Sequence, residues 1–177
     1  MLKKGIFWFT TDLRLDDNRA LTQAASLMDQ LTLVYCPEDS ERLSSFQIGP
    51  SISVNRQQFL NNSIRDLHDS LEPLGQHIIV CQQPEKNLTQ IIENYGITHV
   101  FRSQGQHMLD SKSWDCLNIK YPSVEFCETG GNRLFNEQQF PFDLGNLPAS
   151  FSKFRRKVEK IEILAPQSAV AKLPPPI

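Results

Sequence analysis

The chain has 177 residues, of which 40% are apolar and 21% are charged, and its formal net charge is −2. This composition is typical of one soluble globular domain, and it excludes a global attraction to nucleic acid, so any DNA contact would need a local basic patch. The apolar runs are too short for a membrane span or a secretory signal, and the four cysteines lack metal-ligand spacing. We therefore expect a cytoplasmic protein with reduced thiols.

The first predicted unit consists of a buried strand, a charged loop and a capped helix. Residues 6–9 form an apolar run that is typical of a strand, and residues 10–17 are mostly polar or charged. Asp17 or Asn18 can cap the helix that follows, because their side-chain oxygens accept hydrogen bonds from the free amides of a first turn. In a parallel sheet, the loop after such a strand lies at the carboxyl edge, where ligands bind.

Four more apolar runs of strand length alternate with helical patterns along the chain. They cover residues 31–36, 77–81, 97–101 and 124–127. After a polar loop over residues 37–50, apolar residues at intervals of three and four predict a long helix with one apolar stripe. The stripe consists of Phe59, Leu60, Ile64, Leu67, Leu71 and Leu74, and Gly75 follows as the predicted C-cap. Further helices are predicted from Pro84 to Gly96 and around residues 112–119.

Continuous apolar strands that alternate with helices favour a parallel sheet covered on both faces, because alternating polar residues would mark a sheet with one solvated face. The crossovers should be right-handed. The predicted fold class is therefore α/β, namely a three-layer Rossmann-like domain with a five-stranded parallel sheet.

The last third of the chain is predicted to be irregular, with one short basic helix and a linker. Residues 135–147 show no periodicity, and Ser150 or Ser152 can cap a helix that contains Phe154 and Val158. Residues 153–160 include five cations, which either contact DNA phosphates or form a solvated surface. The proline-rich residues 161–177 are interpreted as a semi-rigid linker to a further domain, after a first domain over residues 1–160.

Common catalytic and phosphate-binding motifs are absent from the sequence. It contains no G-x-G-x-x-G after the first strand, no P-loop, no H-E-x-x-H and no G-x-S-x-G. The four histidines have no evident nucleophile partner, so we expect them to be exposed or satisfied within the fold. Motif analysis alone therefore leaves the function open.

Residues 8–21, WFTTDLRLDDNRAL, resemble the opening W-F-R-x-D-L-R-x-x-D-N-x-A-L of the photolyase/cryptochrome family, with a difference at Thr10. A second specific stretch, residues 147–155, resembles the DASH branch of the cryptochromes. The similarity extends over about residues 5 to 165. It implies the N-terminal α/β antenna domain of a photoreceptor or DNA-repair protein of this family.

Members of this family bind a light-harvesting pterin or deazaflavin at this domain and pass excitation to FAD in a helical C-terminal domain. The FAD then repairs pyrimidine dimers in DNA. These 177 residues contain no counterpart of the helical domain. The resemblance therefore implies a truncated chain that is not catalytic alone, and that meets FAD and DNA only through the helical domain or a separate helical partner.

The resemblance also assigns site residues. Those implied for the chromophore site are Thr10, Asp12, Cys36, Pro37, Arg56, Ser103, Gln104, Gly105 and Gln106. Those implied for docking to the helical domain are Arg14, Asp17 and Asn18.

Two departures from the family pattern weaken the expectation of a methenyltetrahydrofolate or deazaflavin antenna. Thr10 stands where family members often carry arginine, so a cation beside the ligand is lost. Gly105 stands where folate-binding members carry a glutamate that accepts two hydrogen bonds from the pterin. Loss of two charge-assisted bonds would cost ~3–6 kcal/mol, or roughly two to four decades of affinity.

Other interpretations of the same residues stay open. Asp12 and Arg14 have two possible roles: they contact a ligand or the helical domain, or they form a local ion pair with each other. Arg56 either contacts a ligand or lies on a solvated helix face. The chain as a whole is alternatively a stand-alone nucleotide-binding or small-ligand-binding protein, or a protein-interaction module, on the same fold. An exposed apolar docking face would favour self-association.

Overall fold

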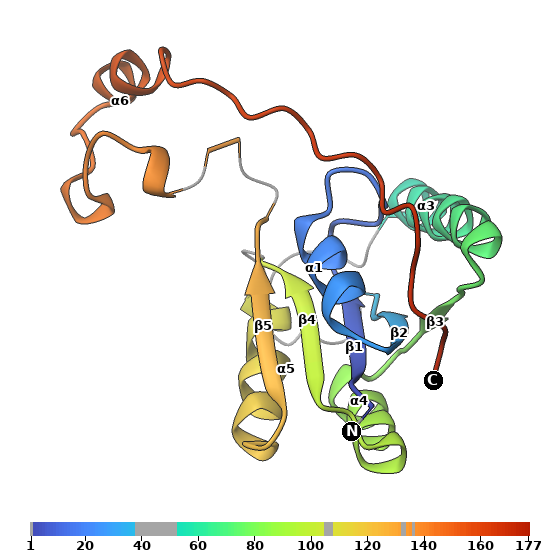
Figure 1. The fold of residues 1–177 in the computed structure, drawn as a ribbon. Helices are drawn as coiled ribbons and strands as arrows, with labels where there is room; N and C mark the ends of the chain where they lie inside the picture. The colour runs from blue at the N-terminus through green and yellow to red at the C-terminus, as the bar shows by residue number, and fades with distance from the viewer. Residues whose placement is uncertain (1, 38–52, 105–107, 132–133, 136) are drawn as a thin grey trace.

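Five parallel strands form a single sheet in the order β3-β2-β1-β4-β5 (Figure 1). The computed structural model of the protein describes residues 2–37, 53–104, 108–131, 134–135 and 137–177. The strands are β1 (Lys4–Phe9), β2 (Gln30–Tyr35), β3 (Ile78–Val80), β4 (His99–Ser103) and β5 (Glu125–Thr129). The predicted five-stranded parallel sheet is confirmed. Because the strand order reverses at β1, the switch point of the sheet lies between β1 and β4.

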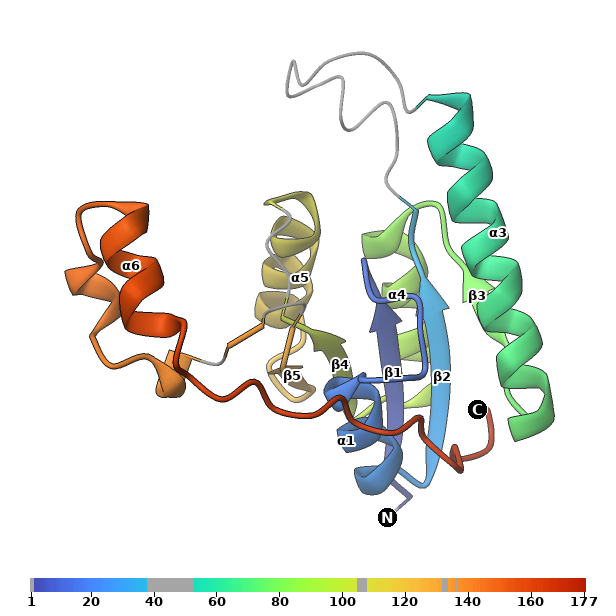
Figure 2. The same ribbon diagram turned by 90° about the horizontal axis from the view of Figure 1, so that it is seen from above.

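Helices cover both faces of the sheet, so the domain has the three predicted layers (Figure 2). One face carries α1 (Arg19–Leu27) and α3 (Val54–Leu71), and the other carries α4 (Pro84–Tyr95) and α5 (Met108–Lys120). Among the helices that the structure describes, none has the length and apolar character needed to cross a bilayer.

Strand β1 is the centre of both cores. Phe7 and Phe9 point to the face of α1 and α3, whereas Ile6 and Trp8 point to the face of α4 and α5, and all four are fully buried. This two-sided burial explains why the run is apolar at every position instead of at every second one.

The predicted apolar stripe of the long helix α3 is only partly buried. Leu67 and Leu71 are buried, but Phe59 is 70% exposed. An 18-residue helix is about 27 Å long, whereas a six-residue strand spans about 20 Å. The first turns of α3 therefore extend past the carboxyl edge of the sheet (Figure 2). Apart from Pro37, the predicted polar loop lies outside the described residues.

The proline-rich tail, residues 166–177, returns to the domain and packs on the face of α1 and α3 (Figure 1). Leu173 is 4% exposed within that core, the Leu31 amide donates to the Pro175 carbonyl at 3.0 Å, and the Gln76 side chain donates to the Pro174 carbonyl. The expectation of a spacer did not account for this packing, in which proline carbonyls remain free to accept hydrogen bonds and Leu173 supplies apolar area. A domain boundary at residue 160 stays a prediction.

Between β5 and this tail, residues 137–163 project away from the sheet and carry α6 (Phe151–Val158) (Figure 1). Ser150 caps α6 by accepting from the Lys153 amide, which selects one of the two predicted caps. The rings of Phe140, Phe142 and Phe154 pack together, with centroids 5.4–6.1 Å apart. We call residues 137–163 the aromatic arm.

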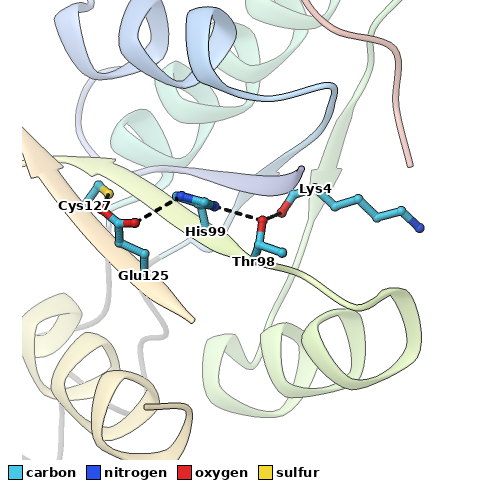
Figure 3. Close-up of polar contacts among 5 residues, drawn as sticks. All are labelled: Lys4, Thr98, His99, Glu125 and Cys127. Atoms are coloured by element: carbon cyan, nitrogen blue, oxygen red, sulfur yellow. Dashed lines mark hydrogen bonds and ion pairs between the residues drawn. The ribbon is translucent and has the colours of Figure 1, made fainter. Parts of the chain in front are cut away.

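At the amino-terminal edge of the sheet, His99 links β4 to β5 (Figure 3). Its Nδ1 lies 2.8 Å from the Thr98 hydroxyl, which itself donates to the Lys4 carbonyl, and its Nε2 lies 3.1 Å from a Glu125 carboxylate oxygen. Glu125 also accepts from the Cys127 thiol at 3.6 Å. His99 is thus satisfied within the fold, as expected, and it lies at the opposite end of the strands from the candidate site.

We predict that Leu173→Ala lowers the free energy of unfolding by about 2–4 kcal/mol, because it opens a cavity under the packed tail. The matched control is Leu164→Ala, since Leu164 is 49% exposed and should change stability by less than about 0.5 kcal/mol. Urea denaturation monitored by circular dichroism measures both. Equal stability of the two variants would contradict the docking of the tail.

Candidate functional site

A buried carboxylate organises the loop that follows β1. Asp12 is 2% exposed. It accepts from the Thr10 amide at 3.0 Å, the Thr10 hydroxyl at 3.4 Å, the Asn18 side-chain amide at 3.1 Å and the Ser103 hydroxyl at 2.5 Å. Since Ser103 ends β4, Asp12 joins β1, the start of α1 and β4 across the switch point.

The remaining polar residues of the loop are satisfied nearby. Asn18 is the N-cap of α1 and accepts from the Leu21 amide at 3.0 Å, which confirms one of the two predicted caps. The Arg14 guanidinium donates to the backbone carbonyls of Asp16 and Asp17, at 3.0 and 3.4 Å. Asp17 takes a left-handed conformation with φ 47°. The loop therefore holds Asp12 and Asn18 inside the fold and leaves Arg14 and Asp17 exposed at its surface.

On one side of Asp12, a cavity of about 270 Å³ opens at the carboxyl edge of the sheet. We call it the edge cavity. It lies among the loop after β1, the end of β2 and the first turns of α3. Its lining residues are Thr10, Thr11, Leu13, Arg14, Tyr35, Cys36, Arg56, Phe59, Leu60 and Ser63. Three predicted chromophore-site residues, Thr10, Cys36 and Arg56, are thus brought together here.

The lining of the edge cavity combines flat apolar surface with cationic groups. Tyr35 and Phe59 supply aromatic rings, whereas Arg14 and Arg56 supply guanidinium groups that suit carboxylate, phosphate or ring carbonyl oxygens. Apolar walls with a few polar groups are typical of small-molecule sites. This chemistry suits a planar ring system with anionic or carbonyl substituents.

On the other side of Asp12, a second cavity of about 200 Å³ lies between the ends of β4 and β5 and the aromatic arm. Arg14, Asp17 and Ser103 line it, together with Gly130 and Gly131. Gly131 has φ 144°, and a Cβ atom there would lie 2.7 Å from the Gln104 carbonyl oxygen, so the close approach of these two loops requires glycine.

The predicted chromophore-site residues therefore do not form one cluster. Ser103 is buried and lines the second cavity, Gln104 is exposed, and Pro37 is partly buried beside Cys36. Asp12 lines neither cavity but supports the loop that borders both. Gly105 and Gln106 lie outside the described residues.

The predicted docking residues also separate. Arg14 lines both cavities and Asp17 lines the second one, so both are available at the surface. Asn18 is 2% exposed, and its side chain is engaged inside the loop. Its position assigns it to helix capping instead of a surface contact.

Sequence reasoning assigned Arg56 of α3 to the chromophore site but missed the other α3 residues that line the edge cavity. Phe59 and Leu60 were assigned to the apolar stripe of the helix, and no site role was given to Ser63. The available signal was length, because a helix of this size is longer than any strand that it can cover. One end of the helix therefore has to extend beyond the sheet, and in the structure it is the first turns that do (Figure 2).

We predict that Asp12→Asn lowers the free energy of unfolding by about 1.5–3 kcal/mol, because an amide NH₂ would face donors that now bond a carboxylate. Asp16→Asn removes the same charge from an exposed position of the same loop and should change stability by less than about 0.5 kcal/mol. Chemical denaturation compares the two. A similar small effect of both substitutions would show that the Asp12 bonds do not hold the loop.

Comparison with known proteins supports the assignment of the fold and the family. The DNA photolyase family model matches residues 5–176. Cryptochrome DASH of Vibrio parahaemolyticus is 34% identical over 98% of this chain and 39% of its own length, and that of Idiomarina loihiensis is 34% identical over 96% of this chain and 39% of its own length. The chain thus spans about two fifths of these relatives.

Solved structures show the same architecture. The Synechocystis cryptochrome superposes with a TM-score of 0.86 and 26% identity, covering 99% of this chain and 38% of that protein. An archaeal photolyase from Sulfolobus tokodaii, solved with two FAD molecules, superposes with a TM-score of 0.69 and 21% identity over 96% of this chain and 37% of its own, which shows the fold alone. On the strength of the family match and the shared fold, this chain belongs to the DNA photolyase family, as a counterpart of its N-terminal α/β domain.

Proposed function

We propose that this chain is a light-harvesting, chromophore-binding domain of a photolyase/cryptochrome-like protein, and that the edge cavity is its chromophore site. The observation that carries the proposal is the meeting of Thr10, Cys36 and Arg56 in one cavity at the carboxyl edge of the sheet. The chain has no catalytic role of its own in this proposal. It absorbs light and passes the excitation to a flavin in a partner domain.

The lining of the edge cavity favours a tricyclic flavin or deazaflavin ring over a pterin. Tyr35 and Phe59 offer flat contacts, and Arg56 offers a charge-assisted hydrogen bond to a ring carbonyl or a phosphate. The Sulfolobus photolyase structure with two FAD molecules is described as implying a novel light-harvesting cofactor. A pterin is disfavoured further because Gly105, which lies outside the described residues, stands where folate-binding members carry a glutamate.

The partner in this proposal is a helical FAD domain. Relatives such as cryptochrome DASH of Vibrio parahaemolyticus are more than twice as long as this chain. The part of such a relative that this chain does not match is long enough to form a helical domain. We place its docking surface on the aromatic arm, where Leu144, Leu147 and Phe151 are 43%, 58% and 76% exposed. Contact with DNA, and repair of pyrimidine dimers, take place only through that domain.

A cytoplasmic location completes the proposal. None of the four cysteines forms a disulfide in the structure, which suits a reducing compartment.

We predict that Arg56→Ala weakens flavin or deazaflavin binding about 10- to 100-fold, the equivalent of one charge-assisted hydrogen bond of ~1.5–3 kcal/mol. Arg65→Ala is the matched control, because Arg65 is exposed on the same helix outside the cavity. Titration of FMN or 8-hydroxy-5-deazaflavin, followed by ligand fluorescence, measures both affinities.

Three outcomes would count against this assignment. Equal loss in both arginine variants would make the effect non-specific. Binding of methenyltetrahydrofolate but of no flavin or deazaflavin would contradict the preference for a tricyclic ring. A melting temperature that rises with ATP but not with any chromophore would favour the nucleotide-binding alternative.

We further predict that the isolated chain self-associates through its aromatic arm when no helical domain covers it. Phe151→Ser should lower the association constant about tenfold or more without a change in melting temperature, because this ring is 76% exposed. The control is Phe59→Ser, which removes an exposed ring (70%) from α3. Sedimentation velocity over a concentration series gives the result. A wild-type chain that stays monomeric over the whole concentration series would contradict self-association through the aromatic arm.

A further inference from the structure

Two cysteines lie side by side at the carboxyl ends of β2 and β3. Tyr35 pairs with Val80 in the parallel register, so Cys36 and Cys81, the next residues of each strand, face each other. The Cys81 amide donates to the Tyr35 carbonyl at 2.8 Å, which keeps the two chains in register up to the cysteines. Both side chains belong to the core cluster beneath α4.

The two thiols are in direct contact. A hydrogen bond from Cys36 lowers the pKa of Cys81, against the opposing effect of burial. Neighbouring strands run about 4.8 Å apart, which lies within the range of about 4.4–6.8 Å that disulfides span between Cα atoms. The spacing of β2 and β3 therefore meets the Cα–Cα distance criterion for a disulfide between Cys36 and Cys81.

Small reagents have a route to each thiol even though the exposed fractions are only 7% for Cys36 and 4% for Cys81. Cys36 lines the edge cavity. Cys81 lines a different cavity of about 310 Å³, between β3 and α4, with the polar residues Asn87 and Gln90 beside it. The pair thus stands between two cavities.

The other two cysteines serve as internal references. Cys116 is exposed on α5. Cys127 is partly buried, and burial together with the Glu125 carboxylate raises its pKa to about 11, so little of it is thiolate near neutral pH.

We propose that Cys36 and Cys81 form a dithiol site that reacts with low-molecular-weight disulfides and closes to an intramolecular disulfide. The Cys81 thiolate attacks one sulfur of oxidised glutathione and releases one glutathione thiolate. Cys36 then loses its proton to solvent and attacks the Cys81 sulfur, which releases the second glutathione. The protein is oxidised by two electrons, and one molecule of oxidised glutathione is reduced to two thiols.

The bond would tie the edge strand β3 to β2 and fix the wall between the two cavities. It would place a rigid, oxidation-dependent link beside the side chains that line the edge cavity. This inference does not depend on the nature of the ligand there.

The experiment uses the full chain with Cys116→Ser, which removes the exposed thiol that would link two molecules. The folded protein is incubated with oxidised glutathione, quenched with acid and examined by intact mass and peptide mapping. We expect a loss of about 2 Da and a Cys36–Cys81 peptide. Addition of Cys36→Ser should leave one glutathione attached to Cys81, and addition of Cys81→Ser should slow glutathione release at least about tenfold. Addition of Cys127→Ser should change nothing.

Phenylarsine oxide provides a second measurement on the protein that retains both thiols, because a trivalent arsenical needs two neighbouring thiols. We expect one arsenical per folded Cys116→Ser chain, and none after either further substitution. The proposal fails if the folded chain keeps both thiols while the urea-unfolded chain is oxidised, or if the single-thiol variants bind the arsenical equally well. Glutathione found on Cys36 in the Cys81→Ser variant, at the original rate, would overturn the order of attack.

Discussion

The Asp12 carboxylate joins three segments that are distant in sequence, and the arrangement of the whole carboxyl edge depends on it. A buried charge is costly unless hydrogen bonds replace its water, and here Thr10, Asn18 and Ser103 supply those bonds. Doubly wound sheets usually open into a ligand crevice at the switch point. In this chain the Asp12–Ser103 hydrogen bond fills the switch point. One cavity therefore lies on each side of this bond, instead of a single crevice in the middle.

This division explains why residues implied for one site are found in two places. The first strand, its loop and the end of β2 contribute Thr10 and Cys36 to the edge cavity, whereas the end of β4 contributes Ser103 to the second cavity. Arg14 borders both cavities.

The sheet and its helix ends could be predicted from sequence because they follow from local chemistry. The two-sided apolar run of β1, the Asn18 and Ser150 caps, and the left-handed glycines Gly75 and Gly96 each report a single backbone requirement. The packing of the tail and the exposure of Phe59 could not be predicted in that way. They depend on how long α3 is relative to the sheet and on which surface remains free for Leu173, and both are properties of the assembled layers.

The aromatic arm is anchored to the domain on both of its sides. It follows β5 in the chain, and just beyond its last residue the tail is held to the loop after β1, where Asp17 and Gln167 exchange two hydrogen bonds, at 2.9 and 3.1 Å. A segment that is held on both sides has fewer accessible conformations than a free chain end, so it loses less conformational entropy on docking. The loop that supports the edge cavity thus also anchors the segment that follows α6.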